Sequence, residues 1–335
     1  MSTRSILLVA PSFPGYWRSI ERGFEDLGYR ASTHCYDAGS NVEKIYNKLA
    51  YEVPGKLRGR PQHISAERVT RRAIAAVRAA KPDIVLVIRG DSLTDDFWQA
   101  VDDLGATRRL WLWDEIRRME HSLEALAAMG PLATYSKADA ASLRAAGAEV
   151  VHVLNAYDPH RPLRAPRPTD DITFVGARFD SREAALTHLH QAGVPVTAYG
   201  RDWSAHPVDR LRTFRVGTTG LPAHRDISLT EAWAVMRDSL ATINIHGDQD
   251  GFTMRTFEAP GVGAVQLIDR PDVADLFEPE KEVLVFRNHD ELLDQTQRVR
   301  RDTTRMRALR EAGARRALAE HTFTQRARVV EQLWV

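Results

Sequence analysis

Short apolar runs alternate with amphipathic segments through the first 156 residues of the chain. The runs 5–10 (SILLVA) and 83–90 (DIVLVIRG) are almost wholly apolar, which is typical of parallel strands buried on both faces. Weaker runs of the same kind are 30–36, 108–115, 132–136 and 149–156. The segments between them with helical spacing are 18–29, 66–82, 95–105 and 137–147. This alternation predicts a parallel sheet with helices on both faces.

The same alternation restarts after a boundary rich in proline. Residues 157–171 hold four prolines and no apolar periodicity, which is typical of a linker between domains. The strands expected beyond it are 172–177, 195–200, 240–247, 264–269 and 282–286. We therefore predict an α/β protein of two doubly wound, Rossmann-like domains that face each other across a cleft, with ligands at the carboxyl ends of the strands. The expected domains are 1–160, 161–320 and a C-terminal helix at 321–335 that crosses back to the first.

The stretch 250–264 (DGFTMRTFEAPGVGA) follows a predicted strand and holds two acids eight positions apart. Gly251 allows the backbone to approach a ligand closely, and the amides near Thr253 and Met254 would point out of a helix N-terminus toward a phosphate. Glu258 is placed to accept hydrogen bonds from ribose hydroxyls, and Asp250 lies at the tip of the turn. A plain helix cap with a surface acid explains the spacing equally well.

These residues resemble the sugar-donor signature of GT-B glycosyltransferases. Asp250, the pair Gly251-Phe252 and Glu258 match the family's two acids and Gly-Phe pair, with Asp in place of the first Glu. The CgeB-like branch is a closer match. The residues that fit it are Asn244, Arg255, Thr256, Phe257, Glu258, Ala259, Gly263 and Ala264. The segments 172–203 and 275–294, and EHTFTQRA at 320–327, are also similar to it.

The resemblance implies transfer of a sugar from a nucleotide-diphosphate sugar, most simply a UDP-sugar, with no cofactor and no metal. Glu258 would bind the ribose. Asp250 would hold the donor sugar as a catalytic residue. Cations would stabilise the leaving diphosphate. The residues assigned to the nucleotide-sugar are Gly15, Gly176, Arg178, Arg182, Gly251, Phe252, Thr253, Met254, Arg255 and Glu258.

The first domain offers weaker signals for the acceptor. Asp114 follows a predicted strand, so it is a candidate general base, although a helix cap explains it as well. Gly15 is the glycine of the first strand-to-helix loop, which also suits a plain turn. Residues 44–81 carry ten Lys and Arg and two acids. They suit an anionic acceptor such as a glycan, lipid carrier or nucleic acid, or simply a solvated helix face.

Composition narrows the class of protein. The net charge of +1 argues against a general polyanion binder, and the single cysteine, Cys35, excludes an intrachain disulfide. No apolar run is long enough to span a bilayer, so we expect a cytoplasmic protein. Two other functions stay open: a nucleotide-sugar epimerase on the same fold, and a nucleotide-sugar or polyanion binding protein without catalysis.

Overall fold

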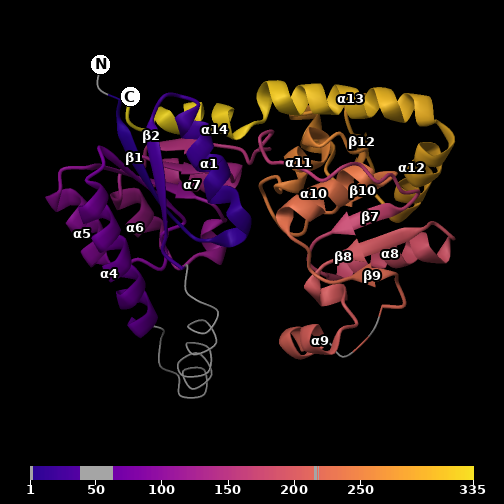
Figure 1. Ribbon diagram of the computed structural model, residues 1–335, viewed down its shortest axis with the longest axis horizontal. Helices are drawn as coiled ribbons and strands as arrows, with labels where there is room; N and C mark the ends of the chain where they lie inside the picture. The colour runs from indigo at the N-terminus through magenta and orange to yellow at the C-terminus, as the bar shows by residue number, and fades with distance from the viewer. Residues whose placement is uncertain (1–2, 38–62, 215–216, 218) are drawn as a thin grey trace. The chain divides into compact units, whose positions relative to one another are not determined.

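The apolar runs of the chain form two separate parallel sheets in the computed structural model, which describes residues 3–37, 63–214, 217 and 219–335 (Figure 1). One compact unit comprises Met1–Leu154 together with Phe323–Val335, and the other comprises Asn155–Thr322. We call them unit 1 and unit 2. Each sheet has six strands, all paired in parallel, and helices cover both faces of each sheet.

Unit 1 is a doubly wound sheet with the strand order β2-β1-β3-β4-β5-β6. Its strands are β1 Ser5–Ala10, β2 Arg30–Cys35, β3 Ile84–Ile88, β4 Thr107–Leu112, β5 Leu132–Thr134 and β6 Val150–His152. Its helices are α1 Tyr16–Glu25, α4 His63–Ala80, α5 Asp95–Asp103, α6 Leu123–Ala128, α7 Lys137–Ala145 and α14 Phe323–Glu331, with 3-10 turns η1 Phe13–Gly15 and η3 Ile116–Arg118. β1 and β3 are buried along their whole length, as their apolar runs predict. The strand order reverses between them, so the switch point of unit 1 lies there.

Unit 2 has the order β12-β11-β10-β7-β8-β9, so its switch point lies between β7 and β10. Its strands are β7 Ile172–Val175, β8 Val196–Tyr199, β9 Ala223–His224, β10 Ala241–Asn244, β11 Gln266–Ile268 and β12 Leu284–Val285. Its helices are α8 Asp180–Gln191, α9 Pro207–Thr213, α10 Leu229–Asp238, α11 Arg255–Gly261, α12 His289–Arg301 and α13 Thr303–Glu320, with 3-10 turns η4 Arg201–Trp203 and η5 Pro271–Asp275. The sequence pattern did not indicate α6, α9 or β9, because each is shorter than the window over which periodicity is visible.

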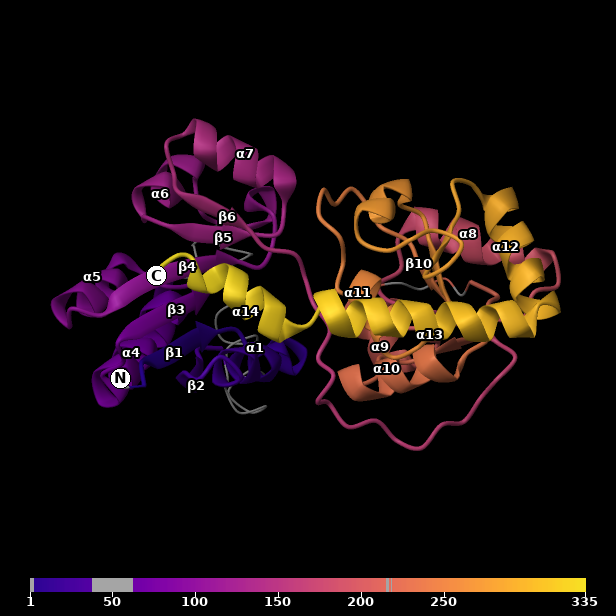
Figure 2. The ribbon, with the colours of Figure 1, turned by 90° about the horizontal axis from the view of Figure 1, so that it is seen from above.

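The end of the chain packs within unit 1. Gly23 of α1 allows this contact, since a Cβ there would lie 2.8 Å from the Phe323 carbonyl oxygen. The Thr324 hydroxyl donates to Asp26 over 2.6 Å, and the indole of Trp334 donates to the Tyr29 hydroxyl over 3.1 Å. Both ribbon views show α14 beside α1 (Figures 1 and 2). No helix of the described ranges is long and apolar enough to cross a membrane.

Cys35 at the end of β2 gives a direct test of unit 1. Burial, with Asp37 and Glu21 nearby, raises the pKa of its thiol to about 11. At pH 8 about 0.1% of the Cys35 side chains are then in the thiolate form, whereas about 25% of ordinary cysteine side chains are. The higher nucleophilicity of a high-pKa thiolate offsets part of this difference, so we expect iodoacetamide to alkylate the folded protein at least tenfold more slowly than it alkylates the protein in urea. Equal rates in the two states, followed by mass spectrometry, would show that the thiol is not shielded.

Candidate functional site

The carboxyl ends of β7 and β10 are joined by one buried guanidinium at the switch point of unit 2. Arg182 of α8 donates to the Ile245 carbonyl oxygen from Nε (3.0 Å) and Nη2 (2.7 Å), and to the Ala177 carbonyl oxygen from Nη1 (3.0 Å). Its pKa is lowered, chiefly by burial. Among the described residues all its hydrogen bonds go to carbonyl oxygens and none to a carboxylate. The charge of Arg182 is therefore not neutralised by direct contact, and it makes this edge of the sheet favourable for an anion.

A closed hydrogen-bond network shapes the corner between β10 and α11. The Asn244 amide donates to Thr256 Oγ1 (3.1 Å), and the Thr253 hydroxyl donates back to Asn244 Oδ1 (3.2 Å). The backbone N–H of Thr253 donates to His246 Nε2 (3.3 Å), and Thr256 Oγ1 lies 3.3 Å from the same nitrogen. A backbone N–H can only donate, so Nε2 accepts and the imidazole proton is on Nδ1. The corner is thus held by side chains from both of its ends.

Asp269 fixes the other side of the His246 ring. His246 Nδ1 lies 2.8 Å from Asp269 Oδ1, and the His246 backbone N–H donates to the same carboxylate over 2.9 and 3.1 Å. The register pairs Asn244 with Ile268, so the residues that follow the two neighbouring strands meet at one edge. Buried His246 is therefore a support for the corner rather than a surface side chain.

The loop 248–252 is tied down by residues far from it in sequence. Arg270 donates to the carbonyl oxygens of Gln249 and Asp250, over 3.1 Å each, and its guanidinium lies 4.6 Å from the centre of the Phe252 ring. The Asn155 amide donates to the Phe252 carbonyl oxygen over 2.8 Å. The side chain of Asp250 stays at the exposed tip. These contacts fix the backbone and leave the tip carboxylate facing solvent.

Glu258 lies in the first turn of α11 and is fully buried. Its carboxylate is ion-paired with Arg255 one turn earlier, whose side chain is one-quarter exposed. Tyr157 packs nearby; burial, with Asp158 and Glu258 adding to it, raises the pKa of its hydroxyl to about 12. The Glu258 carboxylate is therefore paired with Arg255 and closed to solvent.

The two arginines proposed for the diphosphate have different surroundings. Arg178 forms a bidentate ion pair with Glu183, with Nε and Nη2 at 2.8 and 2.7 Å from the carboxylate oxygens. Arg182 has no such partner, as described above. Gly176 directly follows β7, and its carbonyl oxygen accepts from the Trp203 indole over 2.9 Å. Within the described residues, the charge of Arg178 is thus paired with a carboxylate, whereas the hydrogen bonds of Arg182 go to carbonyl oxygens.

The matching edge of unit 1 carries Gly15 and Asp114. Gly15 has φ 80° and precedes α1, a left-handed position that favours glycine. After β3, Arg89 also has positive φ (66°) and is followed by Gly90 at 75°. Arg89 Nη1 lies 3.4 Å from an Asp114 carboxylate oxygen, and Asp114 also accepts from the backbone N–H of Glu115 over 3.0 Å. A strained arginine beside a candidate base marks this edge as worth testing.

The basic segment 44–81 is only partly described. Residues 44–62 lie outside the described residues. The rest is mainly α4, which buries Thr70, Ala73 and Val77 and exposes Arg71 and Arg78. For this half, the arrangement is that of an amphipathic helix with a solvated basic face.

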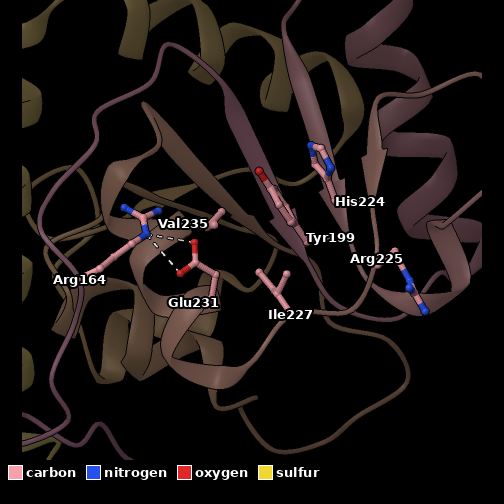
Figure 3. A pocket seen from close by; sticks show the side chains of 7 residues that line it. All are labelled: Arg164, Tyr199, His224, Arg225, Ile227, Glu231 and Val235. Atoms are coloured by element: carbon pink, nitrogen blue, oxygen red, sulfur yellow. Dashed lines mark hydrogen bonds and ion pairs between the residues drawn. The ribbon is translucent and has the colours of Figure 1, made fainter.

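A shallow pocket of about 410 Å³ lies elsewhere in unit 2, between α10 and the ends of β8 and β9. The Tyr199 and His224 rings stack there at 5.0 Å, and Arg164 Nε lies 3.0 Å from Glu231 (Figure 3). The pocket is lined by Arg164, Tyr199, His224, Arg225, Ile227, Glu231 and Val235. It includes none of the corner residues, so the corner and the pocket are separate features of the unit.

Close packing around α11 gives a stability test of the corner. A Cβ on Gly261 would lie 2.4 Å from Cγ of the Tyr157 ring. Overpacking costs about 1–3 kcal/mol or more, whereas the higher helix propensity of alanine stabilises by only about 1 kcal/mol. Gly261→Ala is therefore expected to destabilise unit 2 by about 2 kcal/mol. The melting temperature should fall by about 4–8 °C. Gly247→Ala is the matched control, since nothing lies within 4 Å of a Cβ there. Equal melting temperatures for the two variants would contradict the packing.

Two doubly wound parallel sheets, one in each half of the chain, define the GT-B fold of glycosyltransferases. The sequence model of a family described as "Glycosyl transferase-like" matches residues 182–332, which include the corner. A search of curated protein sequences found no match.

Solved structures resemble the chain over almost its whole length. A glycosyltransferase from Rickettsia africae has a TM-score of 0.65 at 10% identity, covering 99% of both chains. Anabaena HepE in complex with UDP-glucose has a TM-score of 0.64 at 13% identity, covering 98% of this chain and 99% of HepE. A putative UDP-N-acetylglucosamine 2-epimerase from Listeria monocytogenes has a TM-score of 0.55 at 11% identity, covering 95% and 94%. At these identities the likeness establishes the fold.

Proposed function

We propose that this chain is a glycosyltransferase that moves a sugar from a UDP-sugar to an acceptor hydroxyl. One observation carries the proposal: Asn244, His246 and Thr256 hold the corner after β10, and the buried Glu258 follows two residues later, inside the segment that matches the glycosyltransferase-like family. The likeness of residues 244–264 to the CgeB-like branch supports placing the chain in that branch. The UDP-glucose complex of HepE supports a uridine nucleotide as the sugar donor.

Glu258 and Arg255 would act as an exchange pair on the nucleotide. Arg255 is ion-paired with the Glu258 carboxylate. An arriving diphosphate offers Arg255 a doubly charged partner, and the released carboxylate then accepts hydrogen bonds from the ribose hydroxyls. This exchange keeps the buried Glu258 carboxylate hydrogen-bonded in both states, so its lone pairs are never left without a donor.

Cations and backbone amides would stabilise the leaving diphosphate without a metal. Arg182 supplies a charge whose hydrogen bonds, within the described residues, go to carbonyl oxygens, and Arg178 would contribute by leaving Glu183. The attraction between these fixed cations and the diphosphate increases as the leaving group gains negative charge in the transition state. The donor sugar and phosphates would be held by Asp250 and Gly176 and by the backbone of Gly251, Phe252 and Met254, while Thr253, whose N–H donates to His246, would keep this loop in place.

Unit 1 would supply the acceptor contacts. We assign Asp114 as the general base and Gly15 as a close-approach position for the donor phosphate, on the basis of their places after β4 and β1. An anionic acceptor would suit the basic segment 44–81. The exposed tip carboxylate of Asp250 would orient the transferred sugar.

The experiment incubates the protein with a panel of UDP-sugars, alone and with acceptor mixtures, and analyses products by mass spectrometry. A transferase releases UDP in step with a glycosylated acceptor. An epimerase, the alternative that the Listeria neighbour favours, yields an isomerised sugar without an acceptor. Binding of a UDP-sugar with neither product would favour a binding protein and overturn the proposed catalysis.

A further inference from the structure

An exposed apolar ridge lies on α9, far along the chain from the corner. Val208, Leu211 and Phe214 are 45%, 74% and 87% exposed, although each is a large apolar side chain. Single exposed apolar residues are ordinary, but three within seven positions concentrate exposed apolar surface on one short segment. Figure 1 shows α9 beyond the end of the sheet where β8 and β9 lie.

Two arginines flank this ridge. Leu211 lies one helical turn after Val208, and Arg210 and Arg212 are its immediate neighbours in sequence. Neither arginine has a carboxylate partner among the residues that the structure describes. The surface of α9 therefore combines apolar side chains with positive charge.

The acid of the helix is turned away from this surface. Asp209 is only 3% exposed, and Arg225 holds it in a bidentate ion pair at 2.7 and 3.0 Å. The ion pair between Arg225 and Asp209 joins α9 to the end of β9, so the helix that carries the ridge is held in place. Phe214 ends the helix with φ 55°, a conformation that residues other than glycine rarely adopt.

We propose that the α9 ridge, consisting of Val208, Leu211 and Phe214 with Arg210 and Arg212, docks on an anionic phospholipid surface. Apolar side chains beside arginines are the composition of helices that lie in the membrane interface. The cations complement acidic headgroups, each typically strengthening binding about fivefold. Three side chains expose at most a few hundred Å², well below the roughly 800 Å² per partner of a stable protein interface. This inference does not depend on the proposed function.

The test is sedimentation of the full chain with vesicles of phosphatidylcholine alone or mixed equally with phosphatidylglycerol. Binding is expected only to the mixed vesicles and should weaken as salt rises. Leu211→Ser with Phe214→Ser should abolish it, and Arg210→Gln with Arg212→Gln should weaken it about twenty-five-fold. Leu318→Ser is the matched control, since Leu318 is an exposed leucine on another helix of unit 2.

Thermal unfolding of each variant shows that it is folded. Sedimentation equal to wild type for the Ser variant, or no sedimentation of wild type with the mixed vesicles, overturns the proposal. If sedimentation equilibrium instead shows a dimer that the Ser substitutions dissociate, without vesicle binding, the ridge is a contact between two copies and the lipid assignment is wrong.

Discussion

Glu258→Ala is expected to abolish the thermal stabilisation that a UDP-sugar gives the wild-type protein. A ligand at a hundredfold excess over its Kd stabilises a fold by about 2.7 kcal/mol, which raises the melting temperature of a unit of this size by about 5–10 °C. Two hydrogen bonds from ribose hydroxyls to a carboxylate contribute about 3 kcal/mol or more together. Their loss weakens binding over a hundredfold, so the shift should disappear at the same ligand concentration. Differential scanning fluorimetry with and without UDP-sugar measures it.

The matched control for this substitution is Glu311→Ala. Glu311 is an exposed acid on α13 of the same unit, so its loss should leave the shift unchanged. Glu258→Gln is a second variant for the same measurement. It keeps the volume of the buried side chain and removes its charge, so it separates the effect of the charge from that of a cavity. A full shift in Glu258→Ala would remove Glu258 from the ribose contact.

His246→Ala should lower the melting temperature by about 6–12 °C. The ring accepts from the Thr253 backbone, contacts Thr256 and bonds to Asp269, all in the interior of the corner. Buried polar groups left without a partner cost about 1–3 kcal/mol each, so a total near 3 kcal/mol is expected. In a unit of this size, each kcal/mol of lost unfolding free energy lowers the melting temperature by about 2–4 °C.

The substitution should also weaken ligand binding, because the His246 ring holds the backbone of the corner. We expect weaker UDP-sugar binding in His246→Ala at a temperature where the variant is fully folded, measured by calorimetry. His190→Ala is the control, since His190 is exposed on α8. A melting temperature within 2 °C of wild type would contradict the role of His246 as a support.

The central parts of both sheets could be predicted from the sequence, for physical reasons. β1 and β3 are buried on both faces, so their apolar runs are continuous and unmistakable. The corner after β10 could be found because a glycine, a helix start and an acid follow one strand. By contrast, β9 has two residues and α9 has seven, too few for a periodic pattern to appear.

The supports of the corner could not be found in this way, because they depend on which strands are neighbours. His246 and Asp269 meet only because β10 pairs with β11 in the register that places Asn244 beside Ile268. A lone histidine in the sequence gives no sign of that pairing. Similarly, Arg178 precedes α8 and Arg182 lies in its first turn, and packing alone decides that Arg182 reaches the carbonyl oxygen of Ile245.

The central claim is that the corner between β10 and α11 binds the nucleotide of a sugar donor. The most direct test is a crystal structure of the protein with UDP. The account predicts the ribose hydroxyls within hydrogen-bond distance of Glu258, with Arg255 turned to the diphosphate. UDP bound instead in the pocket of Tyr199 and His224, with the Arg255–Glu258 pair intact, would contradict it.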